Sequence, residues 1–123
     1  MGRPVTAAAA RGEGALPHVQ IQFAIDDAGV ADAIVDLLLA ERLVACGQRT
    51  GPVVSQYWWK GSREHAEEWL VLLKTRSELA PQVVDAIRSR HTYETPEVVV
   101  LELVGGAPDY FEWIDDVTTG GPR

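Results

Sequence analysis

Cysteine is nearly absent from the chain, since Cys46 is the one cysteine among 123 residues. An intrachain disulfide is therefore excluded, and a lone thiol is typical of a reducing compartment, so we expect a cytoplasmic protein. Long apolar runs are also missing, because no stretch approaches the roughly 18 residues that cross a bilayer. The hydrophobic fraction of 46% predicts a soluble domain with its own core.

Positive charge is scarce as well, with 11 Lys and Arg against 18 Asp and Glu and a net charge of -7. An acidic surface repels the phosphates of nucleic acids and of anionic lipids. We therefore expect neither nucleic acid nor membrane as the main partner, whereas cations are compatible with this surface.

The sequence lacks the short motifs that mark common catalytic and metal sites. It contains no Gly-rich phosphate loop, no G-x-S-x-G and no H-E-x-x-H. A C-x-x-C with paired histidines is missing too, so we predict no preformed, high-affinity metal cage. The remaining catalytic hypothesis uses Cys46 as nucleophile and His91 as base, and no third group that would position the base is visible. We expect a protein without enzymatic activity.

The periodic patterns of one folded domain run over residues 18–117. Residues 1–17 are mostly Ala, Gly, Pro and Arg, and we interpret them as a disordered tail, with a transit peptide as the alternative. Residues 118–123 are a second flexible end in this interpretation.

Apolar spacing and turn residues predict the elements of this domain. The first half contains a strand over 18–25, a helix from the caps Asp26 and Asp27 to near Leu43, and extended chain over 44–59, which is interrupted around Gly47 and at Gly51-Pro52. A turn over 60–63 and a strand over 68–75 follow, and then a helix from Ser77 to 90, in whose first turn Pro81 is poorly placed. The chain continues with a break over 91–96, a strand over 97–104 and a short helix over 108–117.

The resulting order is β-α-β-β-α-β, an α+β arrangement of ferredoxin-like type with a long hairpin. Two helices cover one face of a four-stranded sheet, yet the segments 69–73 and 98–101 are apolar on both faces. A strand that is apolar on both sides must be covered on both sides. Because no further long element is available, we expect another subunit to cover the second face, and Trp58 and Trp59 on the hairpin strengthen this expectation.

Five segments follow one another along the chain, namely 39–46 (LAERLVAC), 55–61 (SQYWWKG), 73–75 (LKT), 91–97 (HTYETPE) and 110–114 (YFEWI). In this order they resemble the segments "ERLAACVN", "S-x-Y-x-W-x-G", "KT", "HPYEVPE" and "YLxWI" of the CutA divalent-cation tolerance proteins. The resemblance implies a trimer of ferredoxin-like subunits with an architecture shared with PII signalling proteins. It also implies tolerance of divalent metals, copper especially, with weak binding of copper or another divalent cation.

The chain departs from the family pattern at several positions. Gly47-Gln48 replaces an apolar residue and an asparagine, Thr92 replaces a proline, and Thr95 replaces an apolar residue. Phe23 occupies the region where metal-binding members can carry a thiol. These differences weaken the metal hypothesis and leave the predicted fold untouched.

Cys46 and His91 are the candidate metal ligands. A thiolate suits copper(I) and zinc, whereas a lone cysteine beside Val44 and Ala45 is also typical of simple packing. His91 follows a helix end, so the alternative is that it caps the free carbonyls there. We interpret His18 and His65 as solvated, and the four tryptophans as packing residues.

A second candidate site is a cleft between subunits, lined by Lys74, Tyr93, Glu94 and Glu97. It would make the protein a PII-like module that senses a small molecule. The alternative is that Tyr93 packs in the domain and that the glutamates pair with Arg88, Arg90 or Lys74.

Overall fold

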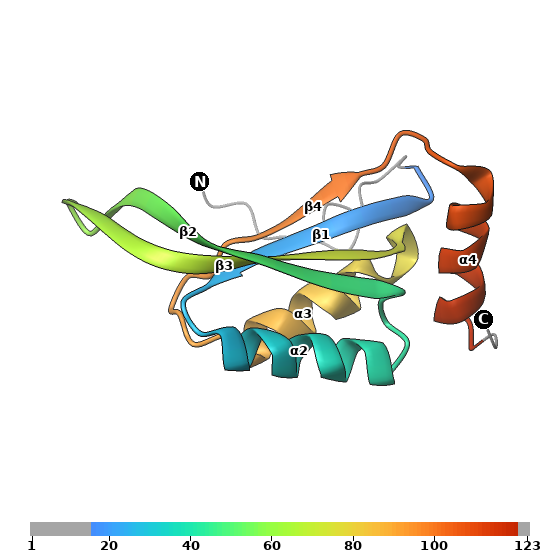
Figure 1. Ribbon diagram of the computed structural model, residues 1–123, viewed down its shortest axis with the longest axis horizontal. Coiled ribbons are helices and arrows are strands. Elements are labelled where there is room, and N and C mark those ends of the chain that lie inside the picture. Colours follow the sequence, from blue (N-terminus) through green and yellow to red (C-terminus); the bar gives the residue numbers. More distant parts are fainter. Residues whose placement is uncertain (1–15, 121–123) are drawn as a thin grey trace.

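The computed structural model describes residues 16–120, in which two helices lie on one side of a four-stranded sheet (Figure 1). The elements, in chain order, are β1 (His18–Ile25), α2 (Ala28–Ala40), β2 (Cys46–Trp59), β3 (Ser62–Arg76), the short 3-10 helix η1 (Ser77–Leu79), α3 (Ala80–Arg90), β4 (Val98–Glu102) and α4 (Pro108–Thr118). The sheet order is β2-β3-β1-β4 and every pairing is antiparallel. The predicted α+β fold of ferredoxin-like type, with its long hairpin, is confirmed.

The core lies between the sheet and helices α2 and α3. Alternate residues of β1 from Val19 to Ile25 are fully buried on the inner face, which is the face that the two helices cover. In register, Ile21 lies opposite Leu73, and Phe23 lies opposite Val71. Burying each such side chain contributes about 2 kcal/mol. The opposite, outer face carries the other alternate residues, which in β1, β3 and β4 are Gln20, Gln22, Leu70, Leu72, Lys74, Val99 and Leu101.

The hairpin is longer than we predicted, because β3 already begins at Ser62. Only Lys60 and Gly61 form its turn, and both have positive φ angles of 50° and 84°. Such a two-residue turn matches the right-handed twist of the strands, so pairing continues directly to Trp59 and Ser62. The predicted turn over 60–63 was therefore two residues too long.

Glycines set two further features of β2. The predicted interruption at Gly51-Pro52 is present as a register shift between Thr50 and Val53, whereas none occurs at Gly47. Gly47 pairs with Leu73, and a Cβ atom there would lie 2.7 Å from Val35 Cγ1. Glycine at 47 thus lets helix α2 approach the edge of the sheet.

The helix limits differ from the prediction in detail. Helix α2 starts as predicted, with Asp27 Oδ1 accepting from Val30 N–H, but it ends at Ala40. Arg42 adopts a left-handed φ of 56°, which turns the chain before Leu43. Pro81 stands at the start of α3, where no helical partner for its missing N–H is needed, so it is well placed.

The folded body extends slightly beyond the predicted 18–117. The carbonyls of Leu16 and Pro17 accept bonds from the Ser77 side chain and backbone N–H, respectively. Thr118 is buried at the end of α4. Residues 1–15 and 121–123 of the two predicted tails lie outside the described residues. Strand β4 is shorter than the predicted 97–104. Within residues 16–120, no helix is long and apolar enough to span a membrane.

Candidate functional site

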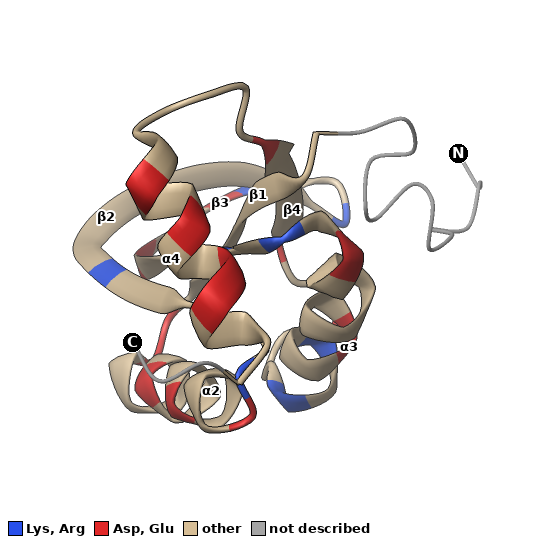
Figure 2. Cartoon of the chain, turned by 90° about the vertical axis from the view of Figure 1, so that its right-hand side faces the viewer, with Lys and Arg blue, Asp and Glu red and all other residues tan. Residues whose placement is uncertain are grey.

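Helix α4 closes the end of the sheet at which β1 and β2 begin (Figure 1). Its buried Ile114 packs with Ala45, and Figure 2 shows acidic residues along the helix. Asp115 and Asp116 stand near the negative end of the helix dipole, which is an unfavourable place for carboxylates. Arg42 and Arg76 offset this charge, because Arg42 Nη1 lies 2.9 Å from Val117 O and Arg76 Nη2 lies 3.3 Å from Thr118 O.

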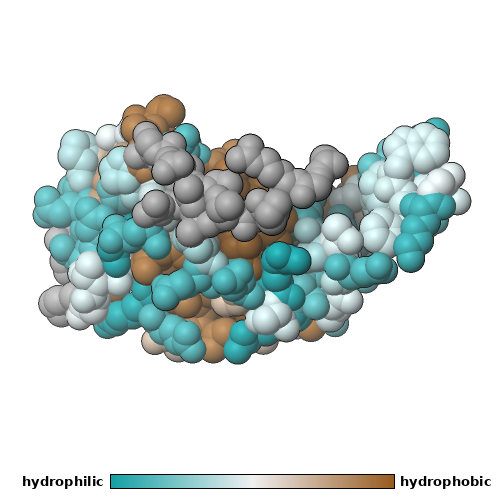
Figure 3. All heavy atoms as spheres, turned by 180° about the vertical axis from the view of Figure 1, so that it is seen from behind, coloured by the Kyte–Doolittle hydropathy of each residue, from teal (hydrophilic) through white to brown (hydrophobic). Residues whose placement is uncertain are grey.

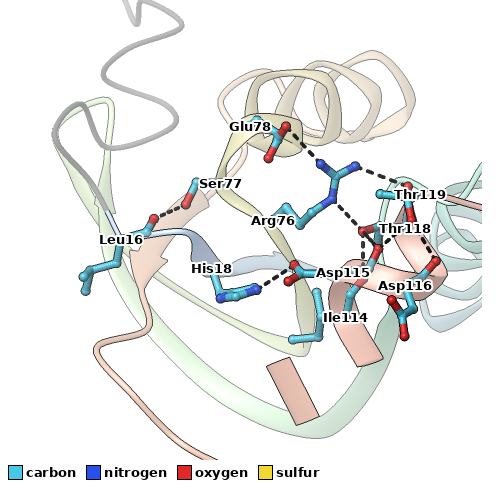
Figure 4. A network of polar contacts seen from close by, with 10 residues as sticks. All are labelled: Leu16, His18, Arg76, Ser77, Glu78, Ile114, Asp115, Asp116, Thr118 and Thr119. Carbon is cyan, nitrogen blue, oxygen red and sulfur yellow. Dashed lines mark hydrogen bonds and ion pairs between the residues drawn. The ribbon is translucent and has the colours of Figure 1, made fainter. Parts of the chain in front are cut away.

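His18 also holds helix α4, and our interpretation of His18 as solvated was wrong. Its exposed fraction is 8%, and its Nε2 lies 2.8 Å from Asp115 Oδ1 (Figure 4). Its ring stacks on Phe111, with the ring centroids 4.7 Å apart. His18 stands at the start of β1, and we took this strand end to be open to solvent. The covering helix α4 comes from the far end of the chain, so strand alternation alone gave no signal of burial. His65, by contrast, is exposed on the hairpin as predicted.

Cys46 starts β2 beside α4 and is half-buried. Its Sγ lies 3.5 Å from Tyr110 Oη, and Lys74 stands opposite it on the same face. Burial, followed by the hydrogen bond to Cys46, raises the pKa of Tyr110 to about 12. A half-buried sulfur is neither sealed in the core nor freely exposed, so Cys46 as a metal ligand stays a prediction.

Both ring nitrogens of His91 have hydrogen-bond partners in this structure, and His91 as a metal ligand stays a prediction. Its Nε2 lies 2.7 Å from Ala24 O, and its Nδ1 lies 3.1 Å from Tyr93 N. A metal needs a nitrogen lone pair, and the Nδ1 lone pair already accepts the Tyr93 N–H. The capping alternative gave the wrong partner for the ring, because the ring bonds a carbonyl of β1 instead of the carbonyls of α3.

The residues of the predicted cleft are divided between two places. Tyr93 Oη donates to Glu68 Oε2 at 2.7 Å, Glu94 pairs with Lys60 at 3.6 Å, and Glu97 lies 3.5 Å from Gln22 Nε2. Lys74 instead lies opposite Cys46, near α4.

Glu68 is the residue of this region that our sequence reasoning missed. The exposed fraction of Glu68 is only 6%. Burial of Tyr93, followed by the hydrogen bond to Glu68 and the charge of Glu68, raises the pKa of Tyr93. The sequence contained a signal for the burial of Glu68. Glu68 directly precedes the apolar run 69–73, which we expect to be covered on both faces, so its carboxylate must point to a covered face.

Metal-ligating side chains do not converge in the part of the chain that the structure describes. Among residues 16–120, no group of three or more His, Cys, Asp and Glu side chains is arranged to hold an ion.

Apolar surface is exposed on the hairpin and on the outer face of the sheet. Val54 and Trp58 expose 68% and 72% of their surface, and Val99 and Leu101 on β4 expose 43% and 44%. Figure 3, which views the molecule from behind, shows the hairpin projecting beyond the body. Patches of this kind mark interaction surfaces in soluble proteins.

Comparison with known proteins identifies the family. The family model described as "CutA1 divalent ion tolerance protein" matches residues 19–117, which is nearly the whole described body. The chain belongs to the CutA1 family. The resemblance seen in the five sequence segments is thereby confirmed.

Individual CutA proteins are similar to this chain in sequence and in fold. "Protein CutA" of Mus musculus is 38% identical over 89 residues, which are 72% of this chain and 50% of that protein. The "Divalent-cation tolerance protein CutA" of Archaeoglobus fulgidus is 35% identical over 86 residues, 70% of this chain and 83% of that protein. A structure titled as the periplasmic CutA of the same archaeon matches with a TM-score of 0.79, at 32% identity, over 82% of this chain and 98% of that one. The chain spans about half the length of the mouse protein that it matches.

Proposed function

We propose that the protein acts in divalent-cation tolerance as a non-catalytic homotrimer and binds copper or another soft cation weakly through Cys46. The observation that carries this proposal is the family match, which extends over 19–117 and so includes every element from β1 to α4. A CutA protein with a matching fold is titled a divalent cation tolerance protein. The single free thiol at Cys46 supports a reducing, cytoplasmic location.

Two exposed apolar surfaces support the assembly. Val99 and Leu101 lie on the outer face, which neither α2 nor α3 covers, and Trp58 lies on the projecting hairpin. Water contact with these side chains is unfavourable by about 25 cal/mol for each Å². Copies of the same chain supply complementary apolar surface, and contacts between different patches close into a ring of cyclic symmetry.

Assembly also bears on the proposed metal binding. Cys46 supplies one soft ligand at the surface of β2, and a thiolate prefers copper(I) over hard cations. Because one copy does not gather three ligands within the described residues, we propose weak binding with further ligands from solvent or from neighbouring copies.

Calorimetric titration of the reduced protein with copper(I) tests the metal part. We expect binding in the micromolar range that Cys46→Ser abolishes, because serine offers no soft ligand, and that His65→Asn leaves unchanged as a control. Equal, weak heats in all three proteins would contradict copper binding at Cys46. They would favour the alternative function, small-molecule sensing, for which the Tyr93–Glu68 and Lys60–Glu94 pairs at the hairpin offer polar groups.

A further inference from the structure

Lys74 is a half-buried cation on the outer face of the sheet, in strand β3. Its neighbours in register on that face are Gln20 in β1 and Cys46 in β2, so no carboxylate stands directly beside it. Among residues 16–120, the side chain of Lys74 takes part in no hydrogen bond and no ion pair. Lysine is almost never buried without a partner. A copy of the chain that covers this face must therefore supply one.

Glu97 is an exposed carboxylate at the opposite end of the same face. Its Oε2 lies 3.5 Å from Nε2 of Gln22, an outer-face residue of β1, and its backbone carbonyl accepts the N–H of Ala24. Lys74 instead lies opposite Gln20, at the other end of β1, and β3 and β4 flank β1 on its two sides. At the rise of a β-strand, the two charged residues are separated by about 13 Å along the strands. This separation keeps Lys74 and Glu97 apart within one copy.

The exposed apolar surface of the outer face lies between these two charges. It consists of Leu70, Leu72, Val99 and Leu101. A strip with a cation at one end and a carboxylate at the other is complementary in charge to a second copy of itself, once opposite ends of the two copies meet. We propose that Lys74 of one copy pairs with Glu97 of the next copy. This inference rests on the homotrimer of the proposed function, and it names the contact that sets the register of neighbouring copies.

The pair adds direction to a contact that is otherwise apolar. Burial of Leu and Val side chains is favourable in any orientation, so apolar strips alone fix the register of two copies poorly. The charge pair fixes it, because a shifted contact leaves the Lys74 ammonium buried without a partner. The carboxylate of Glu97 has room for this second donor, since it accepts several hydrogen bonds and Gln22 uses one oxygen. Each copy gives its lysine to one neighbour and its glutamate to the other, as a closed ring requires.

Charge exchange between positions 74 and 97 tests the pair, with light scattering on the full chain diluted in urea as the readout. Lys74→Glu alone and Glu97→Lys alone bring like charges together in every contact, and each should raise the dissociation constant about tenfold or more. In the double variant every contact again joins opposite charges, so most of the lost affinity should return. Arg88→Glu, on α3 at the helical side, is the matched charge reversal and should leave the constant unchanged.

Two results of this experiment would overturn the pair while leaving the trimer intact. One is a single charge reversal at 74 or 97 that dissociates no more readily than Arg88→Glu. The other is a double variant that recovers none of the lost affinity. An unmodified chain that is a monomer at every concentration would overturn the homotrimer, and this inference with it.

Carbodiimide cross-linking gives a second readout that does not depend on dissociation. This reagent joins an amine to a carboxylate that touches it, through an amide bond. In assemblies mixed from copies with and without a heavy nitrogen label, we expect Lys74–Glu97 peptides that combine one labelled and one unlabelled half. Lys74→Arg keeps the charge and the assembly but offers no amine, so this cross-link should vanish. Cross-linked peptides whose two halves always carry the same label, or none at all in the unmodified chain, would contradict the pair.

Discussion

At the scale of single residues, small differences in side-chain volume decide where a helix meets the sheet. Gly47 stands between Val35 of α2 and Leu73 of β3, and its missing side chain leaves room for both. The family pattern that the chain resembles has an apolar residue at this position, so this glycine is a departure with a packing consequence of its own. Cores at native density have little space to absorb an added methyl group.

Gly47→Ala should therefore destabilise the protein by about 1 to 2 kcal/mol, because overpacking outweighs the gain in backbone entropy. The measurement is the free energy of unfolding in urea. Gly105→Ala is the matched control, since a Cβ atom there meets nothing within 4 Å, and it should change stability by less than about 0.5 kcal/mol. Equal stability of the two variants would show that α2 moves away without loss.

At the scale of elements, α4 is held by polar contacts near its C-terminal end as well as by Ile114. The His18–Asp115 bond and the Arg76 contact with Thr118 bind the last turns of the helix (Figure 4). Arg42 Nη1 binds the same end, at Val117 O. Side chains from β1, from β3 and from the turn after α2 thus fix one helix end in place. The N-terminal half, with Tyr110 and Phe111, then lies against Cys46 and His18.

Asp115→Ala should loosen α4, because His18 loses its hydrogen-bond partner in a mostly buried place, at a cost of about 1 to 2 kcal/mol. Hydrogen exchange of the α4 amides measures this effect, and α2 amides should keep their protection. Asp115→Asn retains an oxygen acceptor for His18 and should lose less than half as much. If both variants exchanged like the unmodified chain, the His18–Asp115 bond would not anchor the helix.

Local patterns predicted these elements well and failed where distant segments meet. Alternation located β1, and α3 ends at Arg90, directly before the predicted break over 91–96. The length of β3 was underestimated, because residues 62–67 are polar and only the tight turn at Lys60-Gly61 extends the pairing. The partners of His18 and His91 were not foreseen, because they lie 97 and 67 residues away in sequence, beyond the reach of any periodicity.

At the scale of the whole molecule, the exposed apolar surface is divided between the outer face and the hairpin. We propose that other copies of the chain cover it. Leu101→Lys places a charge on β4 within that surface, where burial of an unpaired ammonium is strongly unfavourable. We expect the variant to elute as a smaller species in size-exclusion chromatography with light scattering.

Leu39→Lys is the matched control for this experiment. Leu39 on α2 exposes 39% of its surface, close to the 44% of Leu101, but it lies on the helical side of the molecule. The control should retain the mass of the unmodified protein. If Leu101→Lys also kept that mass, the outer face at β4 would not be the contact between copies.

The long hairpin links folding to the amount of protein present. Strand β1 pairs with β3 only from Trp69 to Arg76, so the outer part of the hairpin, from Val53 to Glu68, is a ribbon of two strands without a third. Such a ribbon is at best marginally stable in water on its own. In the assembly that we propose, neighbouring copies supply the missing layer, and mass action then makes the melting temperature rise with concentration. The same protein would therefore be less ordered in a dilute cell extract than in a concentrated stock.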